Sequence, residues 1–597
     1  RVTDELWNET EPVWDRKGDY LYYFCDREFA PQLFTTLEWN FAVNRTTGLF
    51  ALALRKDVAH PFPPRSDEVT IAKVDDAKKP DDKSDDAAKD APKKPVAIDF
   101  EGLAARATRV PIEADNYSGL TCNDGHLFYM RSAASYYGRD GERPTALMVF
   151  SMDKREASEL VADANGYALS CDGSKLLVAS GGGYQFLDAK TGAGDSKKNV
   201  ATSDMYVERV PRDEWNEVFE EVWRRYRDYF YVENMHGYDW KALHDQYEQL
   251  LPHVGHRADL NYMLGEMVAE LNIGHAYVSG GDWQAPARPQ VALLGADLEY
   301  EVASKAYKIT KILRGQNEEE RYRSPLTEVG IDVHVGEYLL AIDGETLSAE
   351  VDPYRVLRNK AGRTIELTLV GSILDKSKPR KVKVTPISSE TELRYLDYVL
   401  TNRERVDKLS GGRLAYVHIP DMGADGIREF IKWYYGQVRK DGLVVDDRNN
   451  GGGNVSQMLI ERLRRVLLAT QFTRDVDDTG TYPSVVFNGP MVCLLNENSA
   501  SDGDIFPWMF KASGLGPLIG KRSWGGVVGI SDHGPLIDGG AVSVPEFGNN
   551  DKSGAWAIEG HGVDPDIVVE NDAKSLLDGR DPQLERAVLE CLKLCEQ

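Results

Sequence analysis

The chain has 597 residues, of which 42% are hydrophobic and 10% aromatic, as expected for a globular protein of several domains. Its formal net charge of -25 argues against binding nucleic acid through the phosphates. No apolar run approaches the roughly 20 residues of a membrane-spanning helix, so we expect neither nucleic acid nor a membrane as a partner. The six cysteines are scattered without C-x-x-C spacing, so we predict no disulfide framework and no metal site.

The first 205 residues contain short strands with recurring tight turns. Three stretches, 11–24, 119–130 and 166–178, each consist of a strand, an Asp/Gly turn and a second strand. The turns at Asp124 and Asp172 lie about 48 residues apart, a spacing typical of β-propeller blades. We count two or three blades, whereas a propeller needs at least about four to close. Because the chain also starts at Arg1 without an initiator Met or signal-like segment, we interpret it as a fragment or processed product.

Charged residues and proline dominate the stretch 74–96, which has almost no apolar side chains to bury. Such a composition cannot offset the entropy lost on folding, so we predict a disordered insertion. After Pro211 the hydrophobic period becomes helical, in the stretches 215–230, 240–251 and 260–271. This pattern predicts a small helical domain over 206–284, which ends where a helix gives way to a strand.

A strand-rich module follows over 285–390. Residues 293–298 form a glycine-containing loop before a strand, and 324–344 resembles the signature of PDZ domains, with Glu337 where these domains usually carry Asp. PDZ domains capture extended chain ends by adding a strand to a sheet edge. Peptide capture and a structural lid are both consistent with this pattern.

The last third, 391–597, alternates apolar strands with helices, as in an α/β domain. We predict strands over 414–419, 442–446, 492–495 and 567–569, and helices over 426–438 and 456–468. Ser501 follows a buried strand and precedes a helix expected over 508–513. A tight strand-to-helix turn exposes a nucleophile and aims backbone N–H groups at a developing oxyanion. The alternative is helix capping by Ser499, Ser501, Asp502 and Asp504.

A serine nucleophile also needs a base and oxyanion donors. His275, between two small residues at a helix-to-strand junction, is the candidate base, and His561 is its rival. The glycines at 451–453 follow a strand and precede a helix, so they permit close backbone approach. A phosphate loop is the competing interpretation, but its Gly-Lys-Ser/Thr ending is missing. Residues 524–531 form a second glycine-rich strand that would pair with an extended peptide.

Five motifs together resemble the catalytic core of the tricorn protease family, which are self-compartmentalising serine peptidases. They are Asp446-x-Arg-x-Asn-Gly-Gly-Gly, Ser501-Asp-Gly-Asp-Ile-Phe, Ile519-Gly-Lys-Arg-x-Trp-Gly-Gly-Val-Val-Gly-Ile530, Leu536-Ile-Asp-Gly and Gly562-Val-x-Pro-Asp. Residues 418–423 and 273–277 also match. The resemblance implies a multidomain α+β and α/β architecture: the last blades of a β-propeller over 1–205, a helical C1 domain over 206–284, a PDZ domain over 285–390 and a C2 catalytic domain of the tail-specific protease/crotonase-like type over 391–597.

The resemblance implies that Ser501 is the nucleophile, His275 its general base and Glu559 the carboxylate that completes the site through a bridging hydrogen-bond network. It also implies an oxyanion hole formed by the N–H groups of Asp502 and Gly453. The residues implied to line the substrate backbone are Gly451, Gly452, Gly453, Gly529, Ile530 and Ser531. The reaction would release short peptides from oligopeptides, such as proteasome products, through an acyl-enzyme and without a cofactor. The family further implies a homo-oligomer, a hexamer, in the cytoplasm; a periplasmic or secreted location is the alternative.

Two positions depart from the family pattern. Gly274 stands where the archaeal pattern has a serine, so one hydroxyl of the hydrogen-bond network is missing, and a water is a possible substitute. Gln471 stands where that pattern offers an acid to a basic substrate side chain, which argues against a trypsin-like preference.

Two other functions are open. The first is a carboxy-terminal processing peptidase with a Ser-Lys dyad, in which Lys521 would be the base. The second is a propeller-PDZ scaffold whose hydrolase site has decayed.

Overall fold

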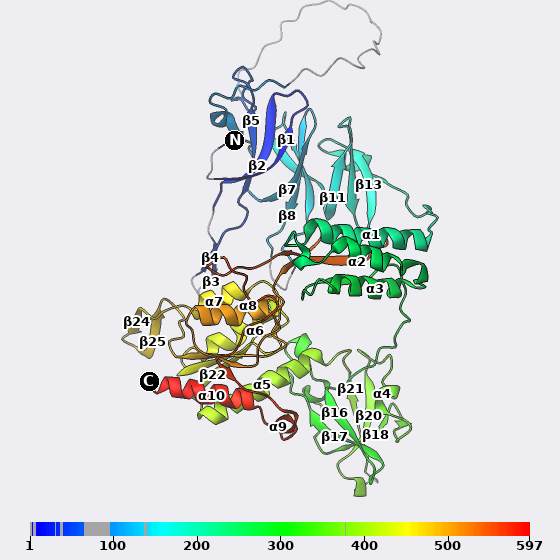
Figure 1. Ribbon diagram of the computed structural model, residues 1–597, viewed down its shortest axis with the longest axis vertical. Helices are drawn as coiled ribbons and strands as arrows, with labels where there is room; N and C mark the ends of the chain where they lie inside the picture. Colours follow the sequence, from blue (N-terminus) through cyan, green and yellow to red (C-terminus); the bar gives the residue numbers. More distant parts are fainter. Residues whose placement is uncertain are drawn as a thin grey trace, which may run out of the picture. The chain divides into compact units, whose positions relative to one another are not determined.

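The computed structural model describes residues 3, 7–29, 32–35, 40–64, 96–135, 140–375 and 378–597 (Figure 1). They form two compact units, Arg1–Glu208 and Arg209–Gln597, and each is described by itself. Apart from Val96, the predicted disordered insertion lies outside the described residues. Among the described helices, none combines the length and the apolar character needed to cross a membrane.

The first unit contains three four-stranded antiparallel sheets, with strand orders β1-β2-β5-β6, β10-β9-β8-β7 and β11-β12-β13-β14. Each of the three predicted hairpins is confirmed, as β1 pairs with β2, β7 with β8 and β11 with β12. The strands are β1 (Asn8–Trp14), β2 (Tyr20–Asp26), β5 (Thr47–Ala53), β6 (Ala107–Arg109), β7 (Asn116–Cys122), β8 (His126–Ser132), β9 (Ala146–Ser151), β10 (Glu156–Val161), β11 (Ala164–Leu169), β12 (Lys175–Ser180), β13 (Gly183–Asp188) and β14 (Lys198–Asn199). Phe24, Tyr129 and Phe150 belong to the core that the first two sheets share.

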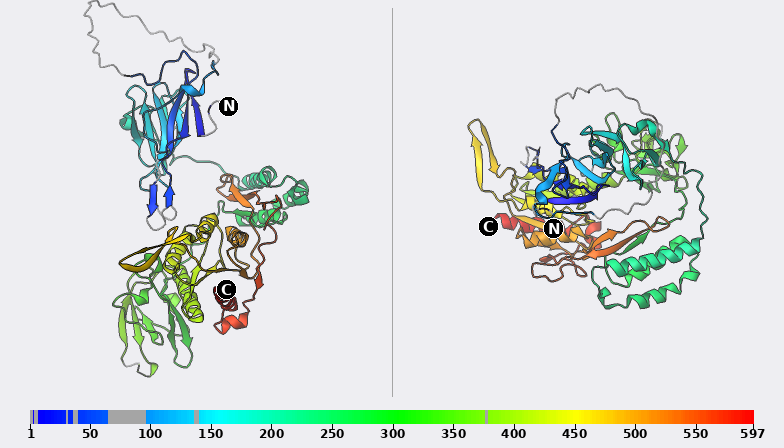
Figure 2. Two further views of the ribbon diagram at one scale, coloured as in Figure 1. Left: turned by 90° about the vertical axis from the view of Figure 1, so that its left-hand side faces the viewer. Right: turned by 90° about the horizontal axis from the view of Figure 1, so that it is seen from above.

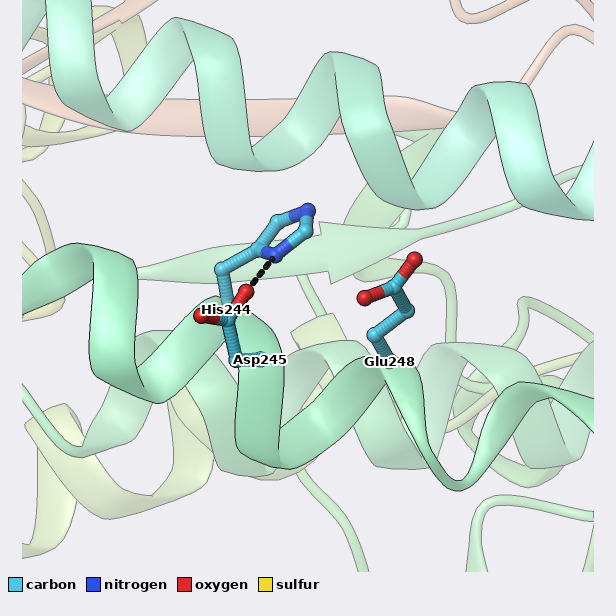
Figure 3. Close-up of side chains that lie close together, drawn as sticks. All are labelled: His244, Asp245 and Glu248. Carbon is cyan, nitrogen blue, oxygen red and sulfur yellow. Dashed lines mark hydrogen bonds and ion pairs between the residues drawn. The ribbon is translucent and has the colours of Figure 1, made fainter.

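The second unit begins with three helices, α1 (Pro211–Tyr229), α2 (Trp240–Glu248) and α3 (Arg257–Ala269), as the helical period predicts. His244, Asp245 and Glu248 lie close together on α2 (Figure 3). The helical core is completed by a three-stranded sheet in the order β15-β29-β28, with bounds Tyr277–Ser279, Ala541–Phe547 and Gly529–Asp532. Val542 and Val544 of β29 are fully buried among the helical residues. Strands from near the end of the chain therefore close this domain.

The PDZ module is a sheet in the order β16-β17-β18-β20-β21, with the short β19 beside β18. Its elements are β16 (Ala296–Glu301), β17 (Ala306–Ile312), β18 (Tyr338–Ile342), β19 (Glu345–Thr346), α4 (Pro353–Val356), β20 (Ile365–Val370) and β21 (Arg380–Val384). Gly295, in the loop before β16, donates its N–H to the buried carboxylate of Glu390 at 2.8 Å. That acceptor comes from the residue that precedes helix α5, so the module is tied to the next domain.

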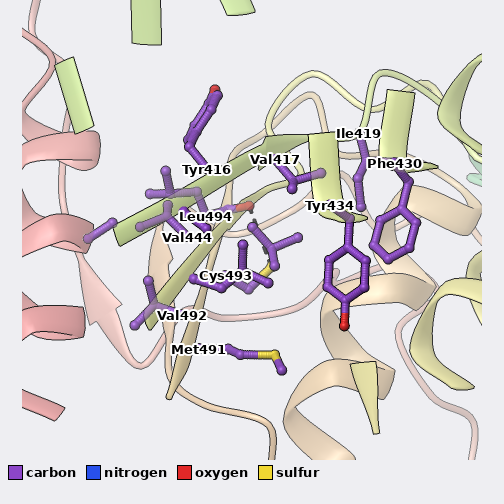
Figure 4. Packing of buried hydrophobic residues seen from close by; sticks show 14 of the residues in the cluster. Tyr416, Val417, Ile419, Phe430, Tyr434, Val444, Met491, Val492, Cys493 and Leu494 are labelled. Carbon is purple, nitrogen blue, oxygen red and sulfur yellow. Dashed lines mark hydrogen bonds between the residues drawn. The ribbon is translucent and has the colours of Figure 1, made fainter. Parts of the chain in front are cut away.

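The α/β domain has a five-stranded parallel sheet in the order β22-β23-β26-β27-β30. Its elements are α5 (Thr391–Ser410), β22 (Leu414–His418), α6 (Ala424–Tyr434), β23 (Gly442–Asp446), α7 (Ser456–Leu463), β24 (Ala469–Thr473), β25 (Val476–Tyr482), β26 (Met491–Leu495), α8 (Asp502–Ala512), β27 (Leu518–Gly520), β30 (Ile567–Val568), α9 (Ala573–Leu577) and α10 (Pro582–Cys595). Val417, Val444, Val492 and Leu494 lie in the buried centre of the sheet (Figure 4). The buried strands β22, β23 and β26 are apolar, as expected for a parallel sheet covered on both faces, except for His418 and Asp446 at the ends of β22 and β23.

Two predicted helix bounds are wrong. The helix expected over 456–468 ends at Leu463, and the chain then forms the antiparallel hairpin β24–β25, which extends away from the α/β domain in Figures 1 and 2. Helix α8 begins at Asp502, six residues before the predicted start, and contains Pro507. Proline favours the first helical turn, which suggested a later start. The observed start places Ser501 directly at the helix N-terminus.

Candidate active site

Ser501 lies on the turn between β26 and α8, with φ 58° and ψ −120°. A positive φ is costly for a residue other than glycine and persists only where surrounding contacts hold it. The turn is held by hydrogen bonds from Ala500 N–H to the Asn450 carbonyl at 2.9 Å and from the Ser499 hydroxyl to the Asp447 carbonyl at 2.8 Å. The Ser501 side chain makes no capping hydrogen bond to α8, so the capping alternative is not realised at this residue.

The glycine loop packs directly against this turn. A Cβ atom on Gly452 would lie 2.6 Å from the Cβ of Ser501 and 2.7 Å from the Ala500 carbonyl oxygen, so the close approach requires glycine. Gly453 forms a parallel bridge with Met422. Within the described residues, neither the N–H of Gly453 nor that of Asp502 has a hydrogen-bond acceptor. Two backbone donors close to Ser501 thus have no partner within the protein.

Asp502 itself has a structural contact as well. Its carboxylate accepts hydrogen bonds from the N–H of Ser456 at 2.9 Å and from the Ser456 hydroxyl at 2.5 Å. Ser456 is the first residue of α7, and helix N-termini favour negative charge. The contact therefore joins the N-termini of α7 and α8 beneath the glycine loop.

His275 is buried and reaches the site from the helical domain. Its Nδ1 lies 2.7 Å from the carbonyl oxygen of Val528, which can only accept a hydrogen bond. The Nδ1 atom therefore carries the proton, and Nε2 is the basic nitrogen. The rings of Trp524 and Tyr277 flank the imidazole at 5.5 and 6.0 Å between centroids. No hydrogen bond joins His275 to Ser501 among the described residues.

The Trp524–Val528 segment connects the parts of the site, although the sequence predicted it as part of a strand. Only β28, which starts at Gly529, is a strand. The N–H of Trp524 donates to the Ser499 carbonyl at 3.0 Å, next to the nucleophile turn. Backbone groups that a strand would pair with a neighbour are used here to hold the segment in place.

Glu559 holds the far end of this segment. A single oxygen of its half-buried carboxylate accepts the N–H groups of Val527 at 2.6 Å and Val528 at 2.8 Å. Val528 thus lies between the two side chains: Glu559 binds its N–H, and His275 donates to its carbonyl, two groups that belong to successive peptide units. The carboxylate is linked to the histidine through this residue rather than directly.

Gly529, Ile530 and Ser531 lie on β28, which pairs with β29 on one side and forms the edge of its three-stranded sheet. Edge strands present unpaired N–H and C=O groups that an extended chain can bind. The predicted substrate-pairing strand is therefore four residues long, from Gly529 to Asp532.

The side chains of the two rival bases, His561 and Lys521, are paired with carboxylates at the surface. His561 is exposed and contacts the carboxylate of Asp564 at 2.7 Å. The Lys521 ammonium contacts Glu497 at 3.2 Å and Glu570 at 3.3 Å. Hydrogen bonds to these two carboxylates raise the pKa of Lys521, whereas a lysine that acts as a base needs a lowered pKa.

Gly274 lies against the Trp524–Val528 segment. A Cβ atom at this position would lie 3.0 Å from the Cα of Gly526 and 3.0 Å from the Trp524 ring. A serine here would require both neighbours to move by a few tenths of an ångström. The indole therefore occupies the space beside the histidine in which the family pattern has a hydroxyl group. Gln471 is exposed on the β24–β25 hairpin.

Two buried carboxyl groups beneath the nucleophile turn were not among the sequence-predicted catalytic or binding residues. Asp447 and Asp504 are both fully buried, and the Oδ2 atom of each has no hydrogen-bond partner among the described residues. Burial, reinforced by the charges of Asp446 and Asp504, raises the pKa of Asp447. Burial also raises the pKa of Asp504 to about 6, and the charge of Glu559 acts in the same direction.

The His244, Asp245 and Glu248 cluster was considered as a metal site (Figure 3). Both nitrogens of His244 have carboxylate partners, Glu220 at 2.9 Å and Asp245 at 3.0 Å, and the Lys241 ammonium also contacts Asp245. Burial lowers the pKa of His244, but these hydrogen bonds outweigh it and raise the pKa. The contacts explain the cluster as an ion-pair network between α1 and α2.

Comparison with protein families gives consistent matches along the chain. Residues 1–190 match the second β-propeller domain of tricorn protease, 211–269 its C1 domain, 292–389 its PDZ domain and 413–569 peptidase family S41. Tricorn protease homolog 1 of Streptomyces coelicolor is 34% identical over 84% of this chain and 48% of the relative. The tricorn protease homolog of Saccharolobus solfataricus is 31% identical over 99% of this chain and 53% of the relative.

A crystal structure of the tricorn protease superposes on the whole chain with a TM-score of 0.83 and 27% identity, and the chain covers 56% of that structure. The chain thus spans about half the length of these relatives. The predicted fold class is confirmed: propeller, PDZ and α/β peptidase parts occur in the predicted order.

Proposed function

Because the chain belongs to the tricorn protease family, we propose that it is a serine endopeptidase that cleaves oligopeptides, such as proteasome products, into short peptides. The observation that supports this most strongly is the hydrogen bond from His275 Nδ1 to the Val528 carbonyl, which leaves Nε2 as the basic nitrogen. Ser501 occupies the strained turn at the start of α8, in the same compact unit as His275. Both features are what a serine peptidase requires.

In the proposed reaction, Ser501 Oγ attacks the carbonyl carbon of the scissile peptide bond and gives its proton to His275 Nε2. The negative charge that develops on the carbonyl oxygen is bound by the N–H groups of Gly453 and Asp502. When the C–N bond breaks, the leaving amine takes the proton from His275. Water then repeats the attack on the ester, with His275 again as the base, and releases the second peptide. No step requires a metal or a cofactor.

Glu559 completes the proposed site through Val528. Its carboxylate binds the N–H of Val528 and so holds in place the residue whose carbonyl accepts from His275. This arrangement fixes the orientation of the imidazole. The substrate backbone is proposed to extend between the loop Gly451–Gly453 and the edge of β28 at Gly529–Ser531.

We further propose the division into parts over 1–205, 206–284, 285–390 and 391–597, a homo-oligomeric and specifically hexameric assembly, and a cytoplasmic location. The family resemblance supports these proposals.

The Ser-Lys dyad has no support in the contacts of Lys521. A decayed scaffold is not favoured either, because Ser501, His275 and Glu559 are all present.

The test is reaction of the purified chain with a fluorophosphonate, followed by peptide mass spectrometry. We expect label on Ser501, loss of label in Ser501→Ala and strongly reduced label in His275→Ala. Lys521→Ala is the control for the dyad and should label like the unmodified chain. A folded sample that does not label would contradict the proposed activity, and label that depends on Lys521 rather than His275 would establish the dyad.

A further inference from the structure

Asp504 links the nucleophile helix to the Trp524–Val528 segment. It lies in the first turn of α8, three residues after Ser501, and is fully buried. Its Oδ1 atom accepts the N–H of Gly525 at 2.8 Å in a buried hydrogen bond. This bond joins the helix behind the nucleophile to the segment that carries the Val528 carbonyl.

The other end of the same segment determines where the imidazole lies. Val528 accepts the Nδ1 hydrogen bond at 2.7 Å, and the Cα of Gly526 would lie 3.0 Å from a Cβ on Gly274, the residue before the histidine. Because protein interiors are close-packed, a shift of the segment is transmitted to these neighbours. The position of His275 therefore depends on how firmly the segment is held.

We propose that Asp504 is a positioning residue for the reaction, since its carboxyl fixes the Trp524–Val528 segment on α8 and the segment fixes His275 relative to Ser501. This inference rests on the proposed function of Ser501 and His275. Asp504 does not touch the reacting atoms.

The environment of Asp504 supports this role. Its Oδ2 atom is buried without a hydrogen-bond partner among the described residues, an arrangement that costs stability. Where a native protein buries a polar atom without a hydrogen-bond partner, a functional site is the expected place. The sequence places a carboxyl where an apolar residue would pack at lower cost, because only an acceptor can bind the Gly525 N–H.

Three variants separate positioning from simple packing. Asp504→Ala removes the acceptor. Asp504→Asn keeps an oxygen that can accept the Gly525 N–H and removes the charge of the carboxylate. Asp566→Ala is a control from the same domain: its exposed carboxylate also accepts one backbone N–H, from Leu518 at 2.9 Å, and it pairs with Lys511 at 2.6 Å.

The rate of fluorophosphonate reaction at Ser501 and the kcat and KM for a fluorogenic peptide are then measured. Misplacing a catalytic group by about 1 Å costs about 100-fold in rate, so we expect Asp504→Ala to lower the labelling rate and kcat by about 10- to 100-fold with little change in KM. Asp504→Asn should recover to within about 3-fold of the unmodified chain, and Asp566→Ala should equal it.

Hydrogen exchange read by mass spectrometry provides a measurement independent of activity. Asp504→Ala should exchange faster at residues 525–528 while the sheet strands stay protected. If this variant does not fold, Asp504→Ser takes its place, because its hydroxyl is too short to reach Gly525.

Two outcomes would overturn the proposal: Asp504→Ala labelling at the unmodified rate, or Asp504→Asn being as slow as Asp504→Ala. An unmodified chain that does not label would instead contradict the proposed function itself.

Discussion

Asp446 and Asp447 are neighbours at the end of β23, yet their surroundings are opposite. Asp446 is paired with Arg448 at 2.7 and 2.9 Å and accepts the hydroxyl of Tyr416 at 2.8 Å. Burial by itself raises its pKa, but the charge and hydrogen bonds of Arg448 outweigh this and lower it. Asp447 is also fully buried, and burial raises its pKa, with the charges of Asp446 and Asp504 acting in the same direction. The same residue type, one position apart, is an ionised structural anchor on one side and a proton-retaining group on the other.

The difference reflects what each side must do. Arg448 also binds Asp581, the N-cap of α10, at 3.0 Å, so the Asp446 side joins the last helix to the centre of the sheet. The Asp447 side contains the turn of the proposed nucleophile, where a cation would compete for the negative charge that develops in the proposed reaction. Stability is concentrated on one face of the strand end, and the proposed chemistry lies on the other.

The largest effect is expected from Arg448→Ala, which leaves Asp446 and Asp581 as buried carboxylates without their cation. Breaking a buried ion pair from one side costs about 3–5 kcal/mol, so the free energy of unfolding by urea should fall by about this amount. Arg413→Ala, which removes an exposed pair with Asp441, is the control and should cost less than about 1 kcal/mol. A similar loss in both variants would mean that the Arg448 cluster is not a special anchor.

Asp504→Asn should change stability in a pH-dependent way. Burial raises the folded-state pKa of Asp504 to about 6, above its value in the unfolded chain. The charge of Glu559 acts in the same direction, and the hydrogen bonds from the Ser523 hydroxyl and the Gly525 N–H oppose it. The contribution of Asp504 to the free energy of unfolding is therefore full below about pH 4 and is lost as the pH rises through about pH 6. The variant should equal the unmodified chain at pH 4 and exceed it by about 1–3 kcal/mol at pH 7. A pH-independent difference would show that Asp504 does not titrate in this range.

Asp447→Asn tests whether the two carboxyls interact. Contacting residues usually show a coupling of about 0.5–3 kcal/mol in a double-mutant cycle. We expect the double variant Asp447→Asn/Asp504→Asn to differ at pH 7 from the sum of the single variants by about this amount, because the charge of Asp504 contributes to keeping Asp447 protonated. If the stability changes of the two single variants simply add up in urea unfolding, the two carboxyl groups do not interact.

The smallest effect is expected from Lys521→Met. Its ammonium is about a third exposed and pairs with two exposed carboxylates, so the free energy of unfolding should change by less than about 1 kcal/mol. The labelling rate of Ser501 should not change. A loss of several kcal/mol would show that surface pairs in this domain act like the buried Arg448 cluster.

Periodicity and turn chemistry predicted most of the local structure. The helices α1, α2 and α3 follow from apolar residues at helical spacing, and the three hairpins follow from their Asp/Gly turns. The start of α8 was wrong because Pro507 normally marks a first turn. Helical spacing and turn residues are properties of neighbouring residues, which is why the sequence alone indicates the helices and the hairpins.

The connections within the site could not be predicted in the same way. The acceptor for His275 is the Val528 carbonyl. Every residue has a backbone carbonyl, so the residue type does not identify this acceptor. Arg448 and Asp581 are separated by more than 130 positions, and no local pattern indicates that they meet. The sequence did suggest Ser501, His275, Glu559 and the glycine loop as a group, through family resemblance, and their roles remain predictions.

The pairing of β15 with β29 has a consequence for synthesis on the ribosome. Tyr277, two residues after His275, pairs with Ser543, so the strand beside the histidine has no partner until the polypeptide has grown by more than 260 further residues. Ser501 is also synthesised before that partner. In a nascent chain, the proposed nucleophile is therefore present before the strand beside the proposed base can pair, and we expect the proposed activity only after translation has passed Ser543.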